Sequence, residues 1–301
     1  MKLIQGFSRL IQFKQQRGWL AILGAIATLG IILIQPATAF QVQVMPSSPQ
    51  LGDTLSVMVQ QPTTDATTVP SVQYEGKTYP MFAVGSNQYR VLLPTTPLDS
   101  PGNRQIQVNS GGQQQNISIS LRDRQFPTQS IWLPPDKQGL TGTDFEFDQV
   151  DAFKALVTPD KYWQGAFLRP SSGPVSTIYG VRRYYNGEFA ENYYHRGVDY
   201  AAGTGSPVVA PAAGRVALVG READGFTIHG NVIGIDHGQG VAGIFVHLNR
   251  IDVKAGDMVT AGQVIGGVGS TGSSTGPHLH WGVYVQGQAV DPVPWRYDEI
   301  N

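Results

Sequence analysis

Apolar and polar residues alternate along most of the chain between residues 40 and 124. The alternation is clear in four short stretches, at 40–44, 55–59, 106–108 and 117–121. A strand with one buried face has this period of two. Turn sequences rich in glycine, asparagine and aspartate separate the stretches. The pattern therefore predicts a small immunoglobulin-like β-sandwich over residues 40–124.

A connector is predicted over residues 125–166. Prolines interrupt its first part, after which Thr143 and Glu146 have the spacing of a helix capping box. The spacing predicts a short helix from about 144 to 157, ended by the Thr158–Pro159 pair. Apolar residues at helical spacing would pack this helix on the domain that follows, which is a structural role.

From residue 167 onward the pattern changes to short apolar strands separated by glycine turns. The strands are expected at 208–210, 214–219, 232–235, 243–246 and 264–268. No segment of this region has a convincing helical period. We therefore predict a mainly β chain with a second β domain at 167–301, and all six histidines lie within it, between residues 195 and 280.

The first 39 residues have the pattern of an export signal. Four basic residues precede an apolar run at 19–34, and an Ala-x-Ala cleavage sequence follows at 37–39. An uncleaved membrane anchor is the alternative, although the run is shorter than the ~20 residues that a spanning helix needs. Both interpretations place the protein outside the cytoplasm, in the periplasm or cell envelope. Membrane contact is expected only through this segment.

Charge and cysteine content exclude several classes of function. The chain has 21 basic and 22 acidic residues, and removal of residues 1–39 would leave 17 basic ones. Such a surface does not predict a nucleic-acid partner. The chain contains no cysteine, which excludes disulfides, zinc–thiolate sites and a thiol nucleophile.

Two groups of residues can supply metal-site chemistry. His278 and His280 precede an apolar β-type run, and residues two apart in a strand face the same way, ~6.6 Å apart. His195 and Asp199 would lie ~13 Å apart in a straight strand, so they can share a metal only if the chain bends, and Gly197 permits a bend. Together the groups can supply two histidines and one aspartate, a set that suits zinc and leaves a position open for water.

These motifs and their surroundings resemble the lysostaphin-type (LytM-like) zinc metalloendopeptidases, which hydrolyse bacterial peptidoglycan. The matching segments are 179–182, 195–199, 205–210, 214–216, 246–248, 262–263 and 269–280. The resemblance covers about residues 167–295. It implies an antiparallel β-sheet peptidase domain of the duplicated-hybrid-motif type, preceded here by the sandwich and the helical connector.

The resemblance also implies residue roles. His195, Asp199 and His280 correspond to the ligands of one Zn²⁺ per chain, and His247 and His278 correspond to an unligated catalytic pair. We assign the general base to His278 and oxyanion stabilisation to His247, although the sequence alone does not separate the two roles. Phe245 departs from the pattern, because many members have tyrosine there.

The resulting hypothesis is an exported zinc metalloendopeptidase that hydrolyses amide bonds in peptidoglycan cross-links or stem peptides. Its expected partners are peptidoglycan peptides, with envelope proteins as further candidates. A non-catalytic envelope regulator that activates a cell-wall amidase is the alternative. Retention of all three metal ligands favours the enzyme. A zinc peptidase that acts on secreted protein is a third hypothesis, because its active site would have the same chemistry as that of a peptidoglycan endopeptidase.

Overall fold

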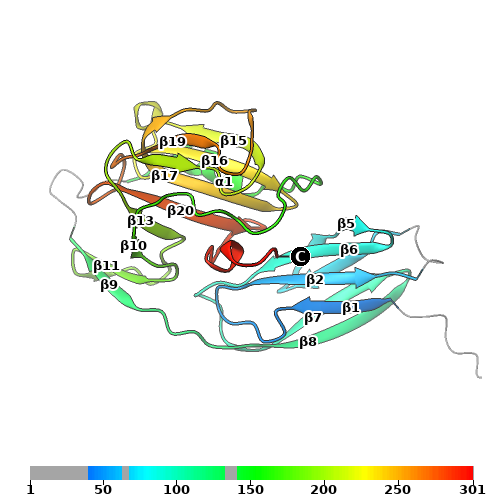
Figure 1. Ribbon diagram of the computed structural model, residues 1–301. Helices are drawn as coiled ribbons and strands as arrows, with labels where there is room; N and C mark the ends of the chain where they lie inside the picture. Colours follow the sequence, from blue (N-terminus) through cyan, green and yellow to red (C-terminus); the bar gives the residue numbers. More distant parts are fainter. Residues whose placement is uncertain (1–39, 63–67, 133–140, 301) are drawn as a thin grey trace, which may run out of the picture. The chain divides into compact units, whose positions relative to one another are not determined.

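The computed structural model describes residues 40–62, 68–132 and 141–300. The described chain is mainly β, as predicted, with antiparallel sheets and one α-helix (Figure 1). The expected export signal at 1–39 lies outside the described residues. Within those residues, no helix is both long enough and apolar enough to cross a membrane.

The first strands form two four-stranded antiparallel sheets that share one core, as expected for a sandwich. One sheet has the order β1-β2-β6-β5 and the other β4-β3-β7-β8. Val57 and Val91 pair in the first sheet, Val72 and Val108 pair in the second, and all four side chains are buried in the common core. The strands are β1 (Gln41–Met45), β2 (Thr54–Gln60), β3 (Ser71–Tyr74), β4 (Lys77–Pro80), β5 (Phe82–Gly85), β6 (Gln88–Pro94), β7 (Gly102–Ser110) and β8 (Gln113–Leu121).

The connector contains strand β9 (Thr128–Ile131) and helix α1 (Asp144–Lys154). The sequence did not predict β9, which pairs in parallel with a strand of the next region. Helix α1 begins where predicted, and the Thr143 hydroxyl accepts from the Glu146 amide at 3.0 Å. It ends three residues earlier than predicted. The reason is that the Thr158 carbonyl accepts from Gln239 and its hydroxyl bonds Asp236, which draws this segment toward a distant strand.

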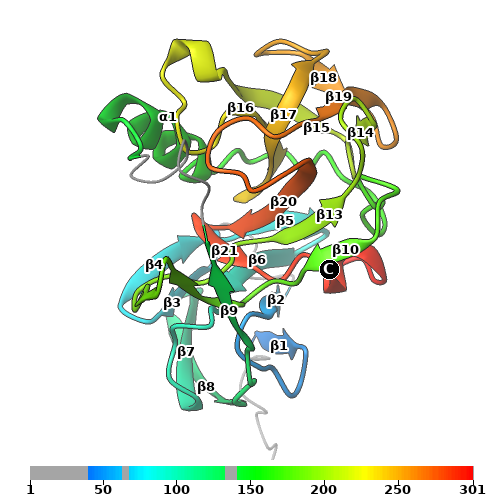
Figure 2. The same cartoon turned by 90° about the vertical axis from the view of Figure 1, so that its left-hand side faces the viewer.

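A ten-stranded antiparallel sheet dominates the region after the connector (Figure 2). Its order is β10-β13-β20-β17-β16-β15-β18, with β19 beside β17 and β14, and β21 beside β20. The strands are β10 (Val175–Thr177), β13 (Val198–Ala201), β14 (Pro207–Val209), β15 (Gly214–Gly220), β16 (Asn231–Gly238), β17 (Val241–Ile251), β18 (Met258–Val259), β19 (Val264–Val268), β20 (His278–Val285) and β21 (Gln288–Val290). A separate small sheet has the order β12-β11-β9, with β11 (Arg182–Tyr185) and β12 (Glu188–Phe189).

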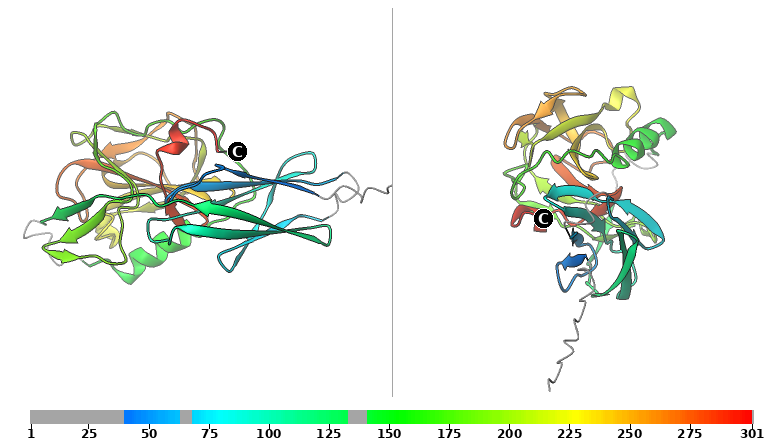
Figure 3. Two further views of the ribbon diagram at one scale, coloured as in Figure 1. Left: turned by 90° about the horizontal axis from the view of Figure 1, so that it is seen from below. Right: turned by 90° about the vertical axis from the view of Figure 1, so that its right-hand side faces the viewer.

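The central strands of the large sheet are buried almost throughout. Residues 232–238 of β16 and 241–246 of β17 are buried, which explains why these segments are nearly continuous apolar and glycine runs instead of alternating ones. Two short 3-10 turns, η2 (Glu222–Asp224) and η3 (Pro294–Arg296), are the other helical elements of the described chain (Figure 3).

Arg90 of β6 joins the sandwich to the C-terminal region, and both belong to one compact unit. Its side chain is buried, donates to Gln239 Oε1 at 2.6 Å and to the Ile300 carbonyl at 3.1 Å, and lies 5.2 Å from the Trp163 ring centre. Burial lowers the pKa of Arg90 to about 10, so it stays charged at neutral pH. A buried cation with charge-assisted hydrogen bonds fixes the two regions against each other.

Replacing Arg90 with alanine is expected to reduce the free energy of unfolding by about 3 kcal/mol, because the change leaves a cavity and unpaired buried acceptors. Urea unfolding of the chain from residue 40 onward would measure the loss. Arg104→Ala is the matched control, since its ion pair with Glu75 lies at the surface and should contribute less than about 1 kcal/mol. Equal losses in the two variants would contradict the structural role of Arg90.

Candidate metal centre

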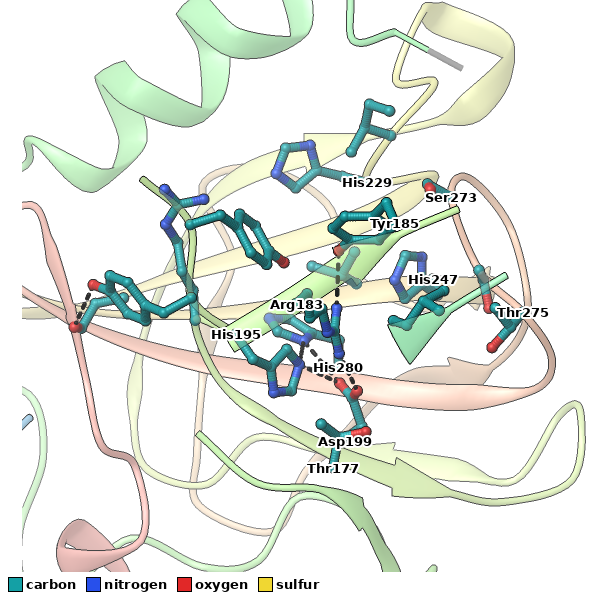
Figure 4. Close-up of a pocket in the computed structure, with 18 of the residues that line it drawn as sticks. Thr177, Arg183, Tyr185, His195, Asp199, His229, His247, Ser273, Thr275 and His280 are labelled. Carbon is teal, nitrogen blue, oxygen red and sulfur yellow. Dashed lines mark hydrogen bonds and ion pairs between the residues drawn. The ribbon is translucent and has the colours of Figure 1, made fainter. Parts of the chain in front are cut away.

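Three side chains converge on one point beside the large sheet (Figure 4). His195 Nε2 lies 2.9 Å from Asp199 Oδ1 and 3.0 Å from His280 Nδ1, and the last two atoms are 2.8 Å apart. His195 and Asp199 are buried, and His280 is partly exposed. These are the three residues that the resemblance implies as metal ligands.

Strand pairing brings the distant residues together. β13 pairs with β20 in antiparallel register, so that Asp199 lies opposite His280 and Ala201 lies opposite His278. The two histidines face the same way, as residues two apart in a strand do, and both reach Asp199 Oδ1, at 3.8 Å from His278 Nε2 and 2.8 Å from His280 Nδ1.

Gly197 lies at a bend immediately before β13, as expected, and it has a second role. Its backbone lies so close to β20 that a Cβ atom would be 2.3 Å from the Trp281 carbonyl oxygen. Only glycine permits this approach. His195 precedes β13, and its ring is oriented by a hydrogen bond between Nδ1 and the Ile178 carbonyl at 2.8 Å.

The donor set fits a metal cation. Because His195 Nδ1 donates its proton to a carbonyl, Nε2 of the neutral ring carries only a lone pair, and it faces a carboxylate oxygen that is also an acceptor. Two acceptors at 2.9 Å repel each other unless a positive charge lies between them. The hydrogen bond of His195 to a backbone carbonyl is the arrangement usual for metal-binding histidines. Tetrahedral ligands ~2.1 Å from zinc would be ~3.4 Å apart, so the three atoms need to separate only slightly.

Charges around Asp199 keep it ionised. Burial alone would raise its pKa, but His195 and His280 outweigh this effect and hold the pKa well below its usual value. The other carboxylate oxygen, Oδ2, lies 3.5 Å from Arg183 Nη2, and Arg183 in turn donates to the Tyr185 hydroxyl at 3.2 Å. Arg183 therefore orients the carboxylate from outside the cluster. The sequence analysis did not identify this residue, because only the pairing of β9 and β12 with β11 places it there.

His247 and His278 lie beside the three converging residues. Their ring centres are 4.8 Å apart. Nδ1 of His247 bonds the Thr271 carbonyl and Nδ1 of His278 bonds the Gly276 carbonyl, each at 2.8 Å. Each neutral ring therefore has its proton on Nδ1 and a free lone pair on Nε2. Burial, together with the neighbouring His278 and His280, lowers the pKa of His247 well below its usual value.

A model of peptidase family M23 matches residues 193–292, which include all five of these site residues. These residues form a peptidase family M23 domain. Named relatives match this chain over about a third of its length. Mpg of Neisseria meningitidis serogroup B, a DD-carboxypeptidase/endopeptidase, is 46% identical over 99 residues, which are 33% of this chain and 22% of Mpg. Lysostaphin of Staphylococcus simulans is 41% identical over 106 residues, which are 34% of this chain and 21% of lysostaphin.

The chain thus spans about a fifth of the length of these curated relatives. One solved structure extends the likeness beyond the M23 domain. The crystal structure of a Pseudomonas aeruginosa protein described as a peptidase M23 is 26% identical, with a TM-score of 0.61, and the match covers 82% of this chain and 95% of that one. The fold of this chain is therefore the M23 fold with an additional N-terminal β region.

A bulge in β17 sets the direction of the His247 side chain within the M23 domain. At this residue β17 passes from one neighbour to another, because Val246 pairs with His280 on β20 whereas Leu248 pairs with Val268 on β19. His247 has a φ of 66°, a left-handed conformation that is uncommon for residues other than glycine, although histidine adopts it more often than most. Such bulges turn a side chain away from the regular strand direction, often next to active sites.

The M23 domain and the connector together line one groove around the five site residues. Three polar loops, at 183–192, 222–231 and 270–276, each contribute lining residues, among them Arg183, His229 and Ser274. Part of the lining also comes from the connector, including Gln129 of β9 and Phe147 of α1, which the sequence did not predict.

The remaining histidines have different environments. His237 is fully buried, donates from Nδ1 to the Ala213 carbonyl at 2.8 Å, and has its pKa lowered to about 4 by burial. It is part of the core. The side chain of His229 is only 20% exposed, and its Nδ1 lies 2.6 Å from a Glu146 carboxylate oxygen.

Proposed function

We propose that this protein is a zinc metalloendopeptidase that hydrolyses amide bonds in the peptide part of peptidoglycan. The observation that carries the proposal is the convergence of three metal-binding atoms within 2.8–3.0 Å, next to two histidines with free Nε2 atoms in one groove. A relative named as a peptidoglycan DD-endopeptidase supports the substrate class. The proposed ligands are His195, Asp199 and His280.

Zinc held by these residues would lower the pKa of a bound water to ~7 and polarise the substrate carbonyl. Two imidazoles and one carboxylate are donors that zinc accepts readily, and the three protein ligands leave a position for water. The remaining requirements are to move a proton from water to the leaving amine and to stabilise the negative charge on the carbonyl oxygen.

His278 is the residue best placed to accept the proton. Its Nε2 is free and lies 3.8 Å from the Asp199 carboxylate, which stabilises the imidazolium that forms. The Gly276 carbonyl fixes the ring through Nδ1, so the proton can enter only at Nε2. These contacts support the assignment of His278 as general base and, after protonation, as the acid that donates to the amine.

Burial, together with the neighbouring His278 and His280, depresses the pKa of His247, which makes it a poor base. Its Nε2 can donate to a developing oxyanion only after it takes up a proton. That proton is taken from solvent, because the one released by the attacking water passes through His278 to the leaving amine. We assign it to stabilisation of the oxyanion, with Thr271 holding the ring at 2.8 Å.

Export of the protein is part of this proposal, because peptidoglycan lies outside the cytoplasmic membrane. The signal-like segment at 1–39 supports it.

Incubation of the purified chain from residue 40 onward with purified sacculi tests the proposal. We expect mass spectrometry to detect released peptides cut at an amide bond, and a metal chelator to reduce release at least 100-fold. Restoring zinc should recover it. Stimulation of an added amidase without intrinsic hydrolysis would support the regulator instead, and cleavage of unfolded protein but not sacculi would support the secreted-protein peptidase.

A further inference from the structure

Glu146 of helix α1 is a fully buried carboxylate outside the M23 match. Its oxygens do not bond back to the helix N-terminus as the capping-box spacing suggests. They accept instead from three successive backbone amides of the loop between β15 and β16. The distances are 3.0 Å to the Thr227 amide, 3.1 Å to the Ile228 amide and 2.7 Å to the His229 amide.

The side chains of this loop add to the attachment. Nδ1 of His229 lies 2.6 Å from Glu146 Oε1. The hydroxyl of Thr227 donates to the Thr141 carbonyl at 2.7 Å, and the hydroxyl of Thr143 donates to the Gly225 carbonyl at 2.9 Å. A single helix end of the connector therefore holds a loop more than 80 residues away in sequence.

Burial would raise the pKa of Glu146, but the hydrogen bonds from His229 and Ile228 outweigh it and lower the pKa to about 2. The carboxylate is therefore ionised at all pH values at which the protein is expected to work. A charged group with this many donors forms a rigid anchor, because charge-assisted hydrogen bonds are the stronger ones.

The anchored loop continues directly to the catalytic histidines. The His229 carbonyl accepts from the His247 amide at 3.1 Å, at the residue whose left-handed conformation aims the ring. The Ile228 carbonyl accepts from the Ser273 amide at 2.9 Å, and the Asn231 amide donates to the Thr271 hydroxyl at 2.9 Å.

The loop that contains Gly230 and the loop that contains Gly272 pack closely against each other. A Cβ atom at Gly230 would lie 2.4 Å from the Thr271 carbonyl carbon, and one at Gly272 would lie 2.5 Å from the Ile228 carbonyl oxygen. The Thr271 carbonyl is the group that holds Nδ1 of His247. Movement of the 227–229 loop would therefore move the acceptor that fixes the catalytic ring.

We propose that Glu146 is a positioning residue of the active site, which acts through the loop at 227–229 on His247 and on the 270–276 loop. The proposal rests on the proposed hydrolytic function and deepens it. The part of the chain needed for full activity then begins in the connector. It includes helix α1, for which the sequence predicted only a packing role. A domain cut at residue 167 would lack this anchor.

Glu146→Gln in the chain from residue 40 onward tests the proposal. Glutamine has the same shape, but it replaces one acceptor oxygen with a donor that faces backbone N–H groups. We expect kcat on a soluble cross-linked muropeptide to fall 10- to 100-fold, with KM and zinc content unchanged. Losses of this size are typical when a residue that orients site side chains through hydrogen bonds is replaced. Asp148→Asn, an exposed acid of the same helix, is the matched control and should keep the parent kcat.

Amide hydrogen exchange provides a readout that does not depend on catalysis. In Glu146→Gln we expect faster exchange at 227–229 and at 271–273, with the sandwich strands unchanged. Thr227→Val removes only the hydroxyl contacts of the loop and should fold normally, with a few-fold loss of kcat in the same direction.

The stability of the parent chain should fall as the pH is lowered from about 4.5 toward 2, because a carboxylate with a depressed pKa stabilises the folded state only above that range. Part of this pH dependence should disappear in Glu146→Gln.

Two results would overturn the proposal. One is an unchanged kcat together with unchanged exchange at 227–229 and 271–273. The other is a loss of activity that matches the loss of folded protein, with the activity per folded molecule preserved, since this would mean a purely structural role. If the parent chain itself does not hydrolyse peptidoglycan, the proposed function fails, whereas the exchange measurement still decides whether Glu146 holds the two loops.

Discussion

Replacing His195 with alanine is expected to reduce bound zinc from close to one per chain to near zero and to abolish hydrolysis. The Nε2 atom of His195 is one of three converging donors, and its orientation is fixed by the Ile178 carbonyl. With two ligands left, the site would lose a large part of its affinity, since structural and catalytic zinc sites both need at least three protein ligands. Elemental analysis of the purified variant after dialysis measures the metal content directly.

The interpretation of this variant requires that it folds. Circular dichroism and the unfolding transition of the variant should remain close to those of the parent treated with chelator, because both proteins then lack bound zinc. His237→Asn is not a suitable control, since that histidine belongs to the core. Zinc content in His195→Ala equal to that of the untreated parent would show that the metal is held elsewhere.

Replacing His278 with alanine is expected to have the opposite combination of effects. His278 Nε2 is 3.8 Å from Asp199 Oδ1, too far for a hydrogen bond, and its Nδ1 is occupied by the Gly276 carbonyl. Zinc should therefore stay near one per chain. Hydrolysis should fall by about 10²- to 10⁴-fold, the usual contribution of a general acid–base residue.

The pair of variants separates metal binding from catalysis, because both residues line the same groove but differ in which of the two functions they are expected to support. Muropeptide release per bound zinc is the quantity to compare. A His278→Ala variant that retained its activity within twofold would exclude this residue as the base. An equal loss of zinc in both variants would instead make His278 part of the ligand set.

Local patterns predicted the parts of the site that depend on strand geometry. The same-side placement of His278 and His280 follows from their spacing in a strand, and the structure has them on one face of β20. The approach of Asp199 to His280 depends on the pairing of β13 with β20, which no local pattern specifies. There the resemblance to known peptidases supplied what the residues alone could not.

Contacts between distant segments account for what the sequence did not predict. Glu146 has the spacing of a helix cap, and the Thr143 half of that prediction is confirmed at 3.0 Å. The other half is wrong because the Glu146 carboxylate accepts from backbone amides more than 80 residues away, which outnumber the single bond that a cap would offer. Arg90 was likewise not predicted, since its partner Gln239 is 149 residues away.

The absence of a side chain at position 197 also limits which residues this position can hold. A Cβ atom there would lie 2.3 Å from the Trp281 carbonyl oxygen and 2.9 Å from His280 Nε2, so any larger residue would force β13 and β20 apart. Because Asp199 lies opposite His280 in the pairing of these strands, such a residue would also move two of the three converging side chains away from each other.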